Sequence, residues 1–169
     1  MKPTIARRLF SWVLQIAGLL LVLLLIHLWQ TRDLVAGVAP PLSGHSLQGT
    51  PVDLDAFGDH PIVIHFWATW CPVCKLEGPS IEQLAEDLQV VTVAMQSGQA
   101  EEVSDYLQHN DLEFTTINDP QGKLASAWHV RGLPTSYIID EDRRVRFVSV
   151  GYTPALTLRL RLWLLDTIL

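Results

Sequence analysis

The sequence predicts an α/β fold in which a mixed sheet carries helices on both faces. Two observations lead to this prediction. Apolar, β-branched strand patterns alternate with amphipathic helical patterns in the order βαβα, and a pair of polar-linked strands and a final helix follow them. The chain has 169 residues, enough for one domain with a proper core plus appendages, so we expect no second globular domain.

The strongest element signals lie in the first half of the domain. The run PIVIHFW, residues 61–67, is apolar and β-branched and predicts a buried central strand. A helix is predicted from Val73 to Leu88, and VVTVAM at 90–95 predicts a second buried strand. The core-facing stripe of that helix consists of Ile81, Leu84, Ala85 and Leu88.

Shorter signals follow. They are a helix at 100–110, a short strand at 114–117, a turn at 118–122 and a helix from Lys123 to Trp128. The strands SYIID, 136–140, and VRFVSV, 145–150, are joined by the polar segment EDRR and predict a hairpin.

The C-terminal segment fits two patterns. LTLRLRL at 156–162 alternates with period two, which is typical of a strand. Thr153 and Pro154, however, suit an N-cap and a first helical residue. One helical face would contain Leu156, Leu160, Trp163 and Leu164. We predict the helix.

An apolar stretch from Leu9 to Trp29 predicts a single transmembrane anchor. About 21 residues at a rise of 1.5 Å span roughly 31 Å, which matches a hydrocarbon core of about 30 Å. A cleavable signal peptide is the alternative, but its apolar region should be shorter, and the only candidate cleavage site, at 35–39, lies well beyond the run.

The charges around the anchor predict its orientation. Lys2, Arg7 and Arg8 precede it and Arg32 alone follows closely, so residues 1–8 should be cytoplasmic and the domain exported. The following residues are rich in Pro, Gly and Ser and lack periodicity. We therefore assign residues 30–41 to a tether and residues 42–169 to the domain.

The charge balance argues against nucleic acid as a partner. Of the twelve Lys and Arg residues, three precede the anchor, which leaves nine against all eighteen Asp and Glu. No basic cluster suited to phosphates is visible. We interpret the acidity as a solvated surface.

Both cysteines of the chain lie in HFWATWCPVCK, residues 65–75. A disulfide that closes a loop of about four residues stabilises by about 2 kcal/mol, against about 4.7 kcal/mol for a loop of a hundred, so a purely structural bridge is a poor explanation. Between a strand and a helix, Cys71 would meet the unpaired N–H groups and the positive dipole end of the helix, which stabilise a thiolate. We interpret Cys71 as an exposed nucleophile and Cys74, one turn inside the helix, as the resolving thiol.

A haem, a zinc or a copper site would be the alternatives to a redox pair. A c-type haem needs His directly after the second cysteine, where this chain has Lys75. Structural zinc wants four ligands, and no histidine pair stands beside the cysteines. Two thiolates can hold copper(I), so a copper-binding or copper-delivery module stays an alternative. We expect no resident cofactor beyond the dithiol.

The segment FWATWCPVCKLEGPSIEQLA resembles the active site of the membrane-tethered, thioredoxin-fold disulfide oxidoreductases of the bacterial periplasm, of the TlpA, ResA and cytochrome-c-maturation type. NDPQGKLASAWHVRGLPTSYIID looks like their run into a cis-proline loop. MQSG at 95–98 and the late RLRLWL look most like suppressor-of-copper-sensitivity D (ScsD) proteins. The resemblance implies a thioredoxin fold with an inserted strand–helix element near Val90 to Asn110.

The resemblance also implies roles for individual residues. Cys71 would attack and Cys74 would resolve, while Pro134 would be the cis-proline beside the disulfide. The residues bordering the substrate groove would be Trp70, Leu133 and Thr135.

Two further residues are candidates for proton transfer. Glu77 falls on the core-facing stripe with Cys74, and a buried acid beside a thiol can take or return the proton of exchange. The family often has Glu there. His65 occupies a strand position where thioredoxin buries an acid; it either relays protons to Cys74 or is a satisfied core histidine.

These features together predict a thiol:disulfide oxidoreductase that is anchored in the inner membrane, with its domain in the periplasm as a monomer. Its partners would be disulfide-containing periplasmic proteins and a membrane electron donor of the DsbD or ScsB kind. The resemblance suggests a reductant connected with copper tolerance or cytochrome c maturation. The copper(I) module and a DsbA-like oxidant stay as alternatives.

Overall fold

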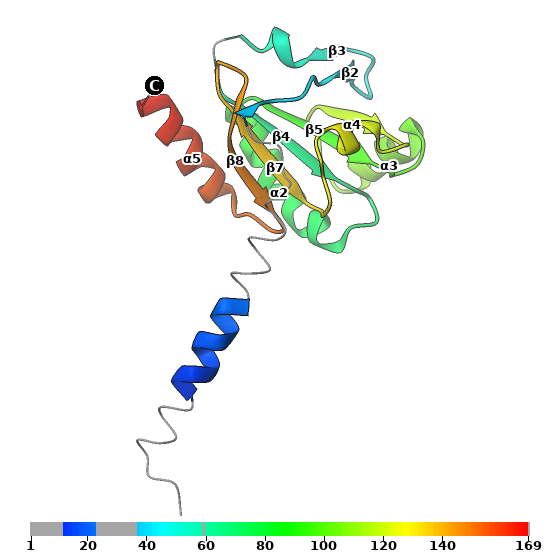
Figure 1. The fold of residues 1–169 in the computed structure, drawn as a ribbon. Helices are drawn as coiled ribbons and strands as arrows, with labels where there is room; N and C mark the ends of the chain where they lie inside the picture. Colours follow the sequence, from blue (N-terminus) through cyan, green and yellow to red (C-terminus); the bar gives the residue numbers. More distant parts are fainter. Residues whose placement is uncertain (1–11, 23–36, 59, 169) are drawn as a thin grey trace, which may run out of the picture. The chain divides into compact units, whose positions relative to one another are not determined.

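The computed structural model describes residues 12–22, 37–58 and 60–168 (Figure 1). It divides into two compact units, Met1–Asp33 and Leu34–Leu169. In the first unit residues 12–22 are helical, and the rest of the predicted anchor, 9–11 and 23–29, lies outside the described residues. Within the described ranges, every helix is too short or too polar to cross a membrane.

The second unit is built around a six-stranded mixed sheet, which confirms the predicted α/β class (Figure 1). Its strand order is β1-β8-β7-β4-β5-β6, with β4, β5 and β6 parallel and the other pairs antiparallel. The strands are β1 (Gly37–Val38), β4 (Ile62–Trp67), β5 (Val90–Met95), β6 (Thr116–Asp119), β7 (Thr135–Ile139) and β8 (Arg144–Val150). A separate hairpin pairs β2 (Ser43–His45) with β3 (Pro51–Asp53), ahead of a 3-10 turn, Leu54–Ala56.

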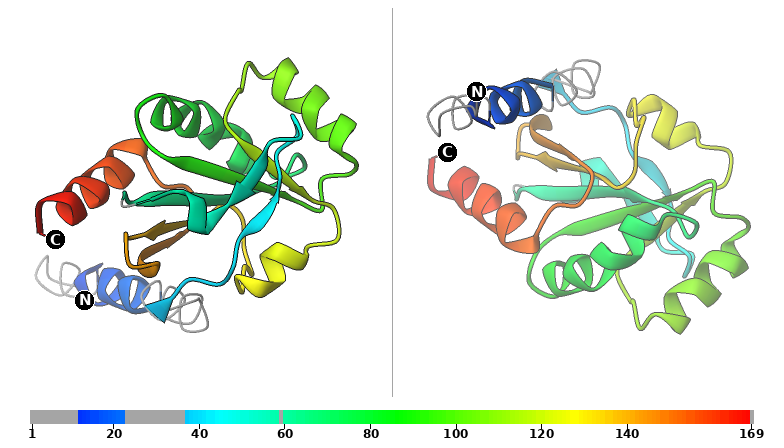
Figure 2. Two further views of the ribbon diagram at one scale, coloured as in Figure 1. Left: turned by 90° about the horizontal axis from the view of Figure 1, so that it is seen from above. Right: turned by 90° about the horizontal axis from the view of Figure 1, so that it is seen from below.

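Helices cover both faces of this sheet (Figure 2). They are α2 (Pro72–Asp87), α3 (Ala100–His109), α4 (Lys123–Ala127) and α5 (Ala155–Ile168). One core cluster packs between one face of the sheet and helices α2, α3 and α5, and a second packs between the opposite face and α4 with the β2–β3 hairpin. We call the face of the sheet covered by α2, α3 and α5 the α2 face.

Alternation along β4 decides which side chains reach the α2 face. Val63 and Trp67 belong to the cluster beneath α2, whereas Ile64 and Phe66 belong to the opposite cluster. Successive side chains of a strand point to opposite faces, so His65 points to the α2 face, where both cysteines lie.

Several predicted boundaries need correction. Residues 37–39 of the predicted tether, 30–41, are held to the sheet, because Gly37 and Val38 pair with β8 and Ala39 N–H donates to Arg143 O. The strand predicted at 114–117 lies at 116–119, since parallel pairing with β5 extends it into the predicted turn. The C-terminal segment is a helix, as predicted. It starts at Ala155 and not at Pro154, and the Thr153 hydroxyl donates to Gly151 O rather than capping the helix.

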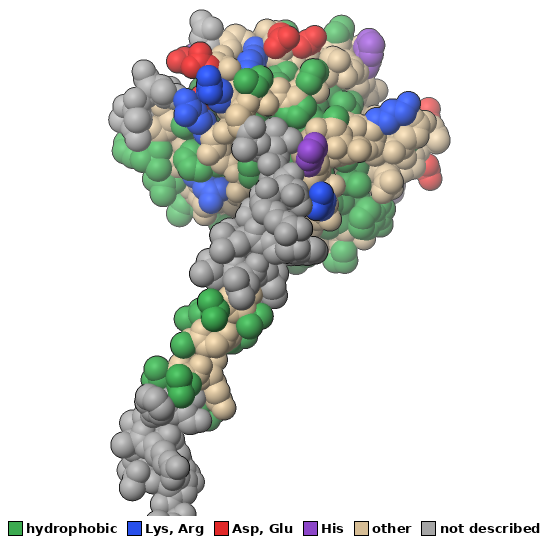
Figure 3. Space-filling model, in the orientation of Figure 1, with side chains coloured by type: hydrophobic (Ala, Val, Ile, Leu, Met, Phe, Trp, Pro, Cys, Tyr) green, Lys and Arg blue, Asp and Glu red, His purple; other side chains and the backbone are tan. Residues whose placement is uncertain are grey.

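Charged side chains are dispersed over the face that Figure 3 shows, with Asp and Glu between Lys and Arg. That face carries no basic patch of the kind that binds a phosphate backbone.

One hydrogen bond ties β7 to the chain that leads away from α4. The Tyr137 hydroxyl donates to Trp128 O at 2.6 Å, and both side chains are fully buried. Their rings meet edge to face with centroids 5.1 Å apart. The bond therefore fixes the start of the segment 128–133, part of which lines the groove described below.

Substituting Tyr137→Phe should lower the free energy of unfolding by about 1–2 kcal/mol, because the buried Trp128 carbonyl loses its donor. Urea denaturation measures the change. Tyr152→Phe is the matched control, since Tyr152 is more than half exposed and should leave stability unchanged. Equal stability of Tyr137→Phe and the parent chain would contradict the assigned role of this bond.

Candidate active site

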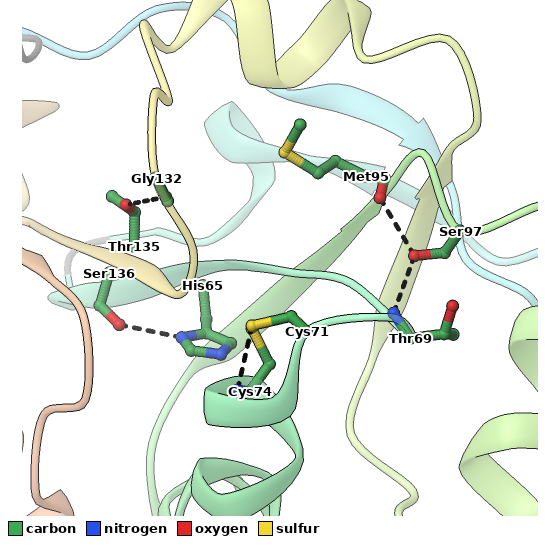
Figure 4. Close-up of a disulfide and its surroundings, with 9 residues drawn as sticks. All are labelled: His65, Thr69, Cys71, Cys74, Met95, Ser97, Gly132, Thr135 and Ser136. Carbon is green, nitrogen blue, oxygen red and sulfur yellow. Dashed lines mark hydrogen bonds between the residues drawn. A yellow bond between two sulfur atoms is a disulfide. The ribbon is translucent and has the colours of Figure 1, made fainter.

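A disulfide joins Cys71 and Cys74 at the start of α2, with Cα atoms 5.3 Å apart (Figure 4). Cys71 is the N-cap of the helix, and its Sγ accepts a hydrogen bond from the Cys74 N–H at 3.1 Å. Pro72 stands in the first turn, where the missing N–H leaves no bond unmade. The predicted position of the pair at a helix N-terminus is confirmed, and one orphan N–H points at the sulfur of Cys71.

A groove of about 410 Å³ opens beside Cys71. Its lining is mostly apolar: Trp70, Cys71, Pro72, Val73, Met95, Val130, Arg131, Gly132 and Leu133. Cys71 contributes to this lining and Cys74 does not, which fits the assignment of Cys71 as the sulfur that meets a substrate. The predicted exposure of Cys71 is wrong, because the groove walls leave it 5% exposed, close to the 3% of Cys74.

The loop before β7 forms the far wall of the groove. The peptide bond between Leu133 and Pro134 is cis, the geometry that the resemblance implies. The Thr135 hydroxyl donates to Gly132 O at 2.7 Å, and Gly151 N–H donates to Pro134 O at 2.8 Å. Both bonds hold the cis-proline loop against the end of the sheet.

Of the three predicted groove residues, Trp70 and Leu133 line the groove and Thr135 does not. Thr135 is fully buried because it is the first residue of β7, and its side chain lies in the core and not at the groove. The prediction that it borders the groove is therefore corrected. Its hydroxyl closes the loop instead.

The MQSG segment, residues 95–98, holds the chain that precedes Cys71. The Ser97 hydroxyl accepts from Thr69 N–H and donates to Met95 O, each at 3.0 Å (Figure 4). The Trp70 indole N–H donates to Gln96 O at 3.0 Å. Trp70 is 60% exposed, but this hydrogen bond fixes the orientation of its indole ring.

Glu77 is fully buried, one turn after Cys74 on α2. Its Oε1 accepts from Thr153 N–H at 3.1 Å, and its Oε2 is buried without a hydrogen-bond partner among the described residues. Burial raises the pKa of Glu77 to about 7, and the Thr153 N–H opposes part of that rise. An acid with this pKa exchanges its proton near neutral pH, as general acid–base catalysis requires.

His65 is buried on β4, and Figure 4 shows its ring between Ser136 and the disulfide. Its Nδ1 lies 2.9 Å from Ser136 Oγ on the neighbouring strand β7. Burial lowers the pKa of His65 to about 3, so the imidazole is neutral throughout the physiological range. Of the two alternatives for His65, this geometry favours the satisfied core histidine.

No group of three or more His, Cys, Asp or Glu side chains that could hold a metal ion occurs within residues 12–22, 37–58 and 60–168. The copper(I) alternative needs only the two thiolates and stays a prediction.

Several residues of the site are not among those predicted from the sequence. Ser136 and Thr153 contact His65 and Glu77, and Met95, Val130 and Arg131 complete the groove. Ser136 and Thr153 lie more than seventy residues from their partners, so strand register and the β8–α5 turn bring them together. Only the closeness of Val130 and Arg131 to the cis-proline motif could have drawn attention to that part of the groove.

Comparisons with known proteins agree with this geometry. The model of the AhpC/TSA family matches residues 35–148. A thioredoxin-like protein of Haemophilus influenzae is 39% identical over 119 residues, which cover 69% of this chain and 71% of that protein. Sporulation thiol-disulfide oxidoreductase A of Bacillus subtilis is 26% identical over 113 residues, with 63% and 68% covered.

A solved structure shows the same fold. A secreted disulfide oxidoreductase of Mycobacterium tuberculosis, homologous to DsbE of E. coli, superposes with a TM-score of 0.64 at 26% identity. The match covers 73% of this chain and 96% of that one. The chain therefore belongs to the AhpC/TSA family and is a thioredoxin-like thiol:disulfide oxidoreductase.

Proposed function

We propose that the protein is anchored in the inner membrane and reduces disulfides of periplasmic protein substrates through Cys71 and Cys74. The observation that carries the chemistry is the place of Cys71, which caps α2, accepts a helix N–H and lines the groove. The apolar segment 9–29 with its flanking charges supports the anchor and the orientation.

The first step joins substrate and enzyme. In the reduced protein the Cys71 thiolate attacks one sulfur of a substrate disulfide, so that the substrate S–S bond breaks and a mixed disulfide forms. The leaving substrate sulfur takes up a proton. The Cys74 N–H, which lies 3.1 Å from Cys71 Sγ, stabilises the attacking thiolate.

The substrate would lie along the groove in extended form. Leu133, next to the cis bond, offers its backbone to the chain that carries the substrate cysteine. The fixed indole of Trp70 and the side chain of Met95 give the groove apolar walls. These contacts bind a peptide without demanding one sequence, which suits a protein with several substrates.

The second step releases the product. Cys74 gives its proton to the Glu77 carboxylate and attacks Cys71 Sγ; the mixed disulfide breaks, and the substrate leaves with both sulfurs reduced. Two electrons pass from the dithiol to the substrate, and the Cys71–Cys74 disulfide remains. A membrane donor of the DsbD or ScsB kind must then reduce it, because the chain has no third cysteine.

Within the family we assign the chain a role similar to that of ScsD proteins, connected with copper tolerance or cytochrome c maturation. MQSG and RLRLWL support this assignment, and MQSG forms the loop that fixes Trp70 beside the groove.

Substituting Cys74→Ser should trap substrates, because the mixed disulfide at Cys71 can no longer be resolved. Non-reducing electrophoresis and mass spectrometry of the full chain in its parent organism should show partners released by a thiol reductant. If the trapped partners are proteins whose cysteines are normally joined in a disulfide, the enzyme acts as a reductant. The double variant Cys71→Ser/Cys74→Ser is the control, because it has no thiol that can form a mixed disulfide.

Absence of any trapped species would count against exchange chemistry. Stoichiometric copper(I) retained by the reduced chain against thiol competitors would favour the copper module instead.

Substituting Glu77→Gln should remove a pH dependence of stability. The folded pKa of Glu77, about 7, lies above its ordinary value of 4.5. The unfolded chain therefore loses this proton at lower pH, and the free energy of unfolding falls as pH rises between these values, by about 3 kcal/mol. Urea unfolding of the oxidised chain at about pH 5 and about pH 8 measures the loss. An equal loss in Glu77→Gln would show that another group causes it.

The resolving step should follow the titration of Glu77 and not that of His65. Glu77→Gln should abolish the rise in the rate of resolution near pH 7, because no carboxylate receives the Cys74 proton. His65→Phe should leave the midpoint in place, since the pKa of His65 is far below this range. Stopped-flow release from a preformed mixed disulfide gives the profile. A midpoint that moves in His65→Phe would support the relay through His65.

A further inference from the structure

The turn between β8 and α5, residues 151–153, contacts two separate parts of the site. Its first N–H, from Gly151, donates to the carbonyl of cis Pro134 at 2.8 Å. Its last N–H, from Thr153, donates to Glu77 Oε1 at 3.1 Å. The Thr153 hydroxyl donates to Gly151 O at 3.2 Å, and Gly151 has φ +82°, so the turn is closed on itself and favours glycine.

The two carboxyl oxygens of Glu77 differ in their hydrogen bonding. Oε1 accepts from a backbone N–H, whereas Oε2 is buried without a hydrogen-bond partner among the described residues. An oxygen that accepts from an N–H is a poorer place for the carboxyl proton than one that does not. The proton of the neutral acid is therefore held on Oε2. Cys74 and Glu77 are three residues apart on α2, so their side chains lie on the same side of the helix.

We propose that the backbone N–H of Thr153 is the positioning group for the acid of the active site. It holds Glu77 by Oε1, leaves Oε2 to exchange the proton with Cys74, and through Gly151 connects this acid to the cis-proline loop. The proposal deepens the function proposed above for Glu77 and rests on it.

The other titratable groups on this face have hydrogen-bond partners of their own, and the hydrogen bond of Glu77 within the described residues is the one from Thr153 N–H. His65 on β4 is neutral and bonded to Ser136. On α5, Arg161 donates to Ser149 and Arg159 to Asp87. The shift of the Glu77 pKa has burial as its first cause, and the Thr153 N–H opposes it.

The functional consequence concerns the charge on Glu77. A hydrogen bond to the carboxylate favours the ionised form, which is the form that accepts the Cys74 proton. Without the Thr153 N–H, Glu77 would keep its proton at neutral pH. The attack of Cys74 on the mixed disulfide would then be slower, even with all the side chains of the site in place. The bond from Gly151 N–H to Pro134 O links the same turn to the cis-proline loop.

The first test uses the unaltered site. In the oxidised, isotope-labelled full chain, the amide resonance of Thr153 should shift with pH, with the same midpoint as the side-chain carboxyl carbon of Glu77. In Glu77→Gln the shift should disappear, because the amide oxygen still accepts the bond but does not ionise. A Thr153 amide that does not follow Glu77 would overturn the proposal.

The second test removes the donor. Thr153→Pro deletes the N–H and the hydroxyl, Thr153→Ala deletes only the hydroxyl, and Thr153→Ser keeps both. Loss of a hydrogen bond to a charged group should raise the Glu77 midpoint by about one pH unit in Thr153→Pro relative to Thr153→Ala. Thr153→Ala and Thr153→Ser should match the parent chain. Equal midpoints in the Pro and Ala variants would contradict the proposal, and if Thr153→Pro does not fold, the first test decides.

These readouts separate the inference from the proposed function. The titrations are measured on the resting oxidised chain and need no substrate. A correct Thr153 assignment with no trapped partner in Cys74→Ser would leave the positioning in place and overturn the exchange function. Trapped partners with a Thr153 amide that does not titrate would do the reverse.

Discussion

Pairing of β4 with a strand on each side fixes the position of the active site. All six residues of β4 are buried, with β5 parallel on one edge and β7 antiparallel on the other. The strand ends at Trp67, so the following residues must leave the sheet there and start α2 at Pro72. Phe66 pairs with Thr135 in the antiparallel register, which puts the cis-proline loop at the same end of the sheet. The dithiol and the loop beside it meet because of this register.

The same register lays a polar row beneath α2. Adjacent strands align Thr116, Thr92, His65, Ser136 and Ser149 in one line across the sheet, and all are buried. The row is neutral and hydrogen-bonded at several points, including Thr92 to Thr116 and His65 to Ser136. A hydrogen-bonded neutral row is tolerated in the core where an unpaired charge would not be. Among the described groups around the disulfide, Glu77 is the acid whose pKa lies near neutrality.

The redox properties depend on few contacts. Each unit by which the folded chain lowers the pKa of Cys71 is worth about 1.4 kcal/mol and makes the disulfide about 30 mV more oxidising. Two observed features surround this sulfur: the Cys74 N–H at the helix N-terminus donates to Cys71 Sγ, and the groove walls bury Cys71. The strand beneath the disulfide contributes a neutral group, because His65 is buried and its Nδ1 lies 2.9 Å from Ser136 Oγ.

The sequence alone determined the fold class, the dithiol and its place at a helix start, because strand and helix periodicities and a short motif are local properties. It also placed Glu77 on the core-facing stripe of α2, since a helical wheel needs no tertiary information. Only the tertiary structure decided what surrounds these residues. The partners Ser136 and Thr153, the shielding of Cys71 and the place of Thr135 in the core depend on strand register and on a turn distant in sequence, which no local pattern encodes.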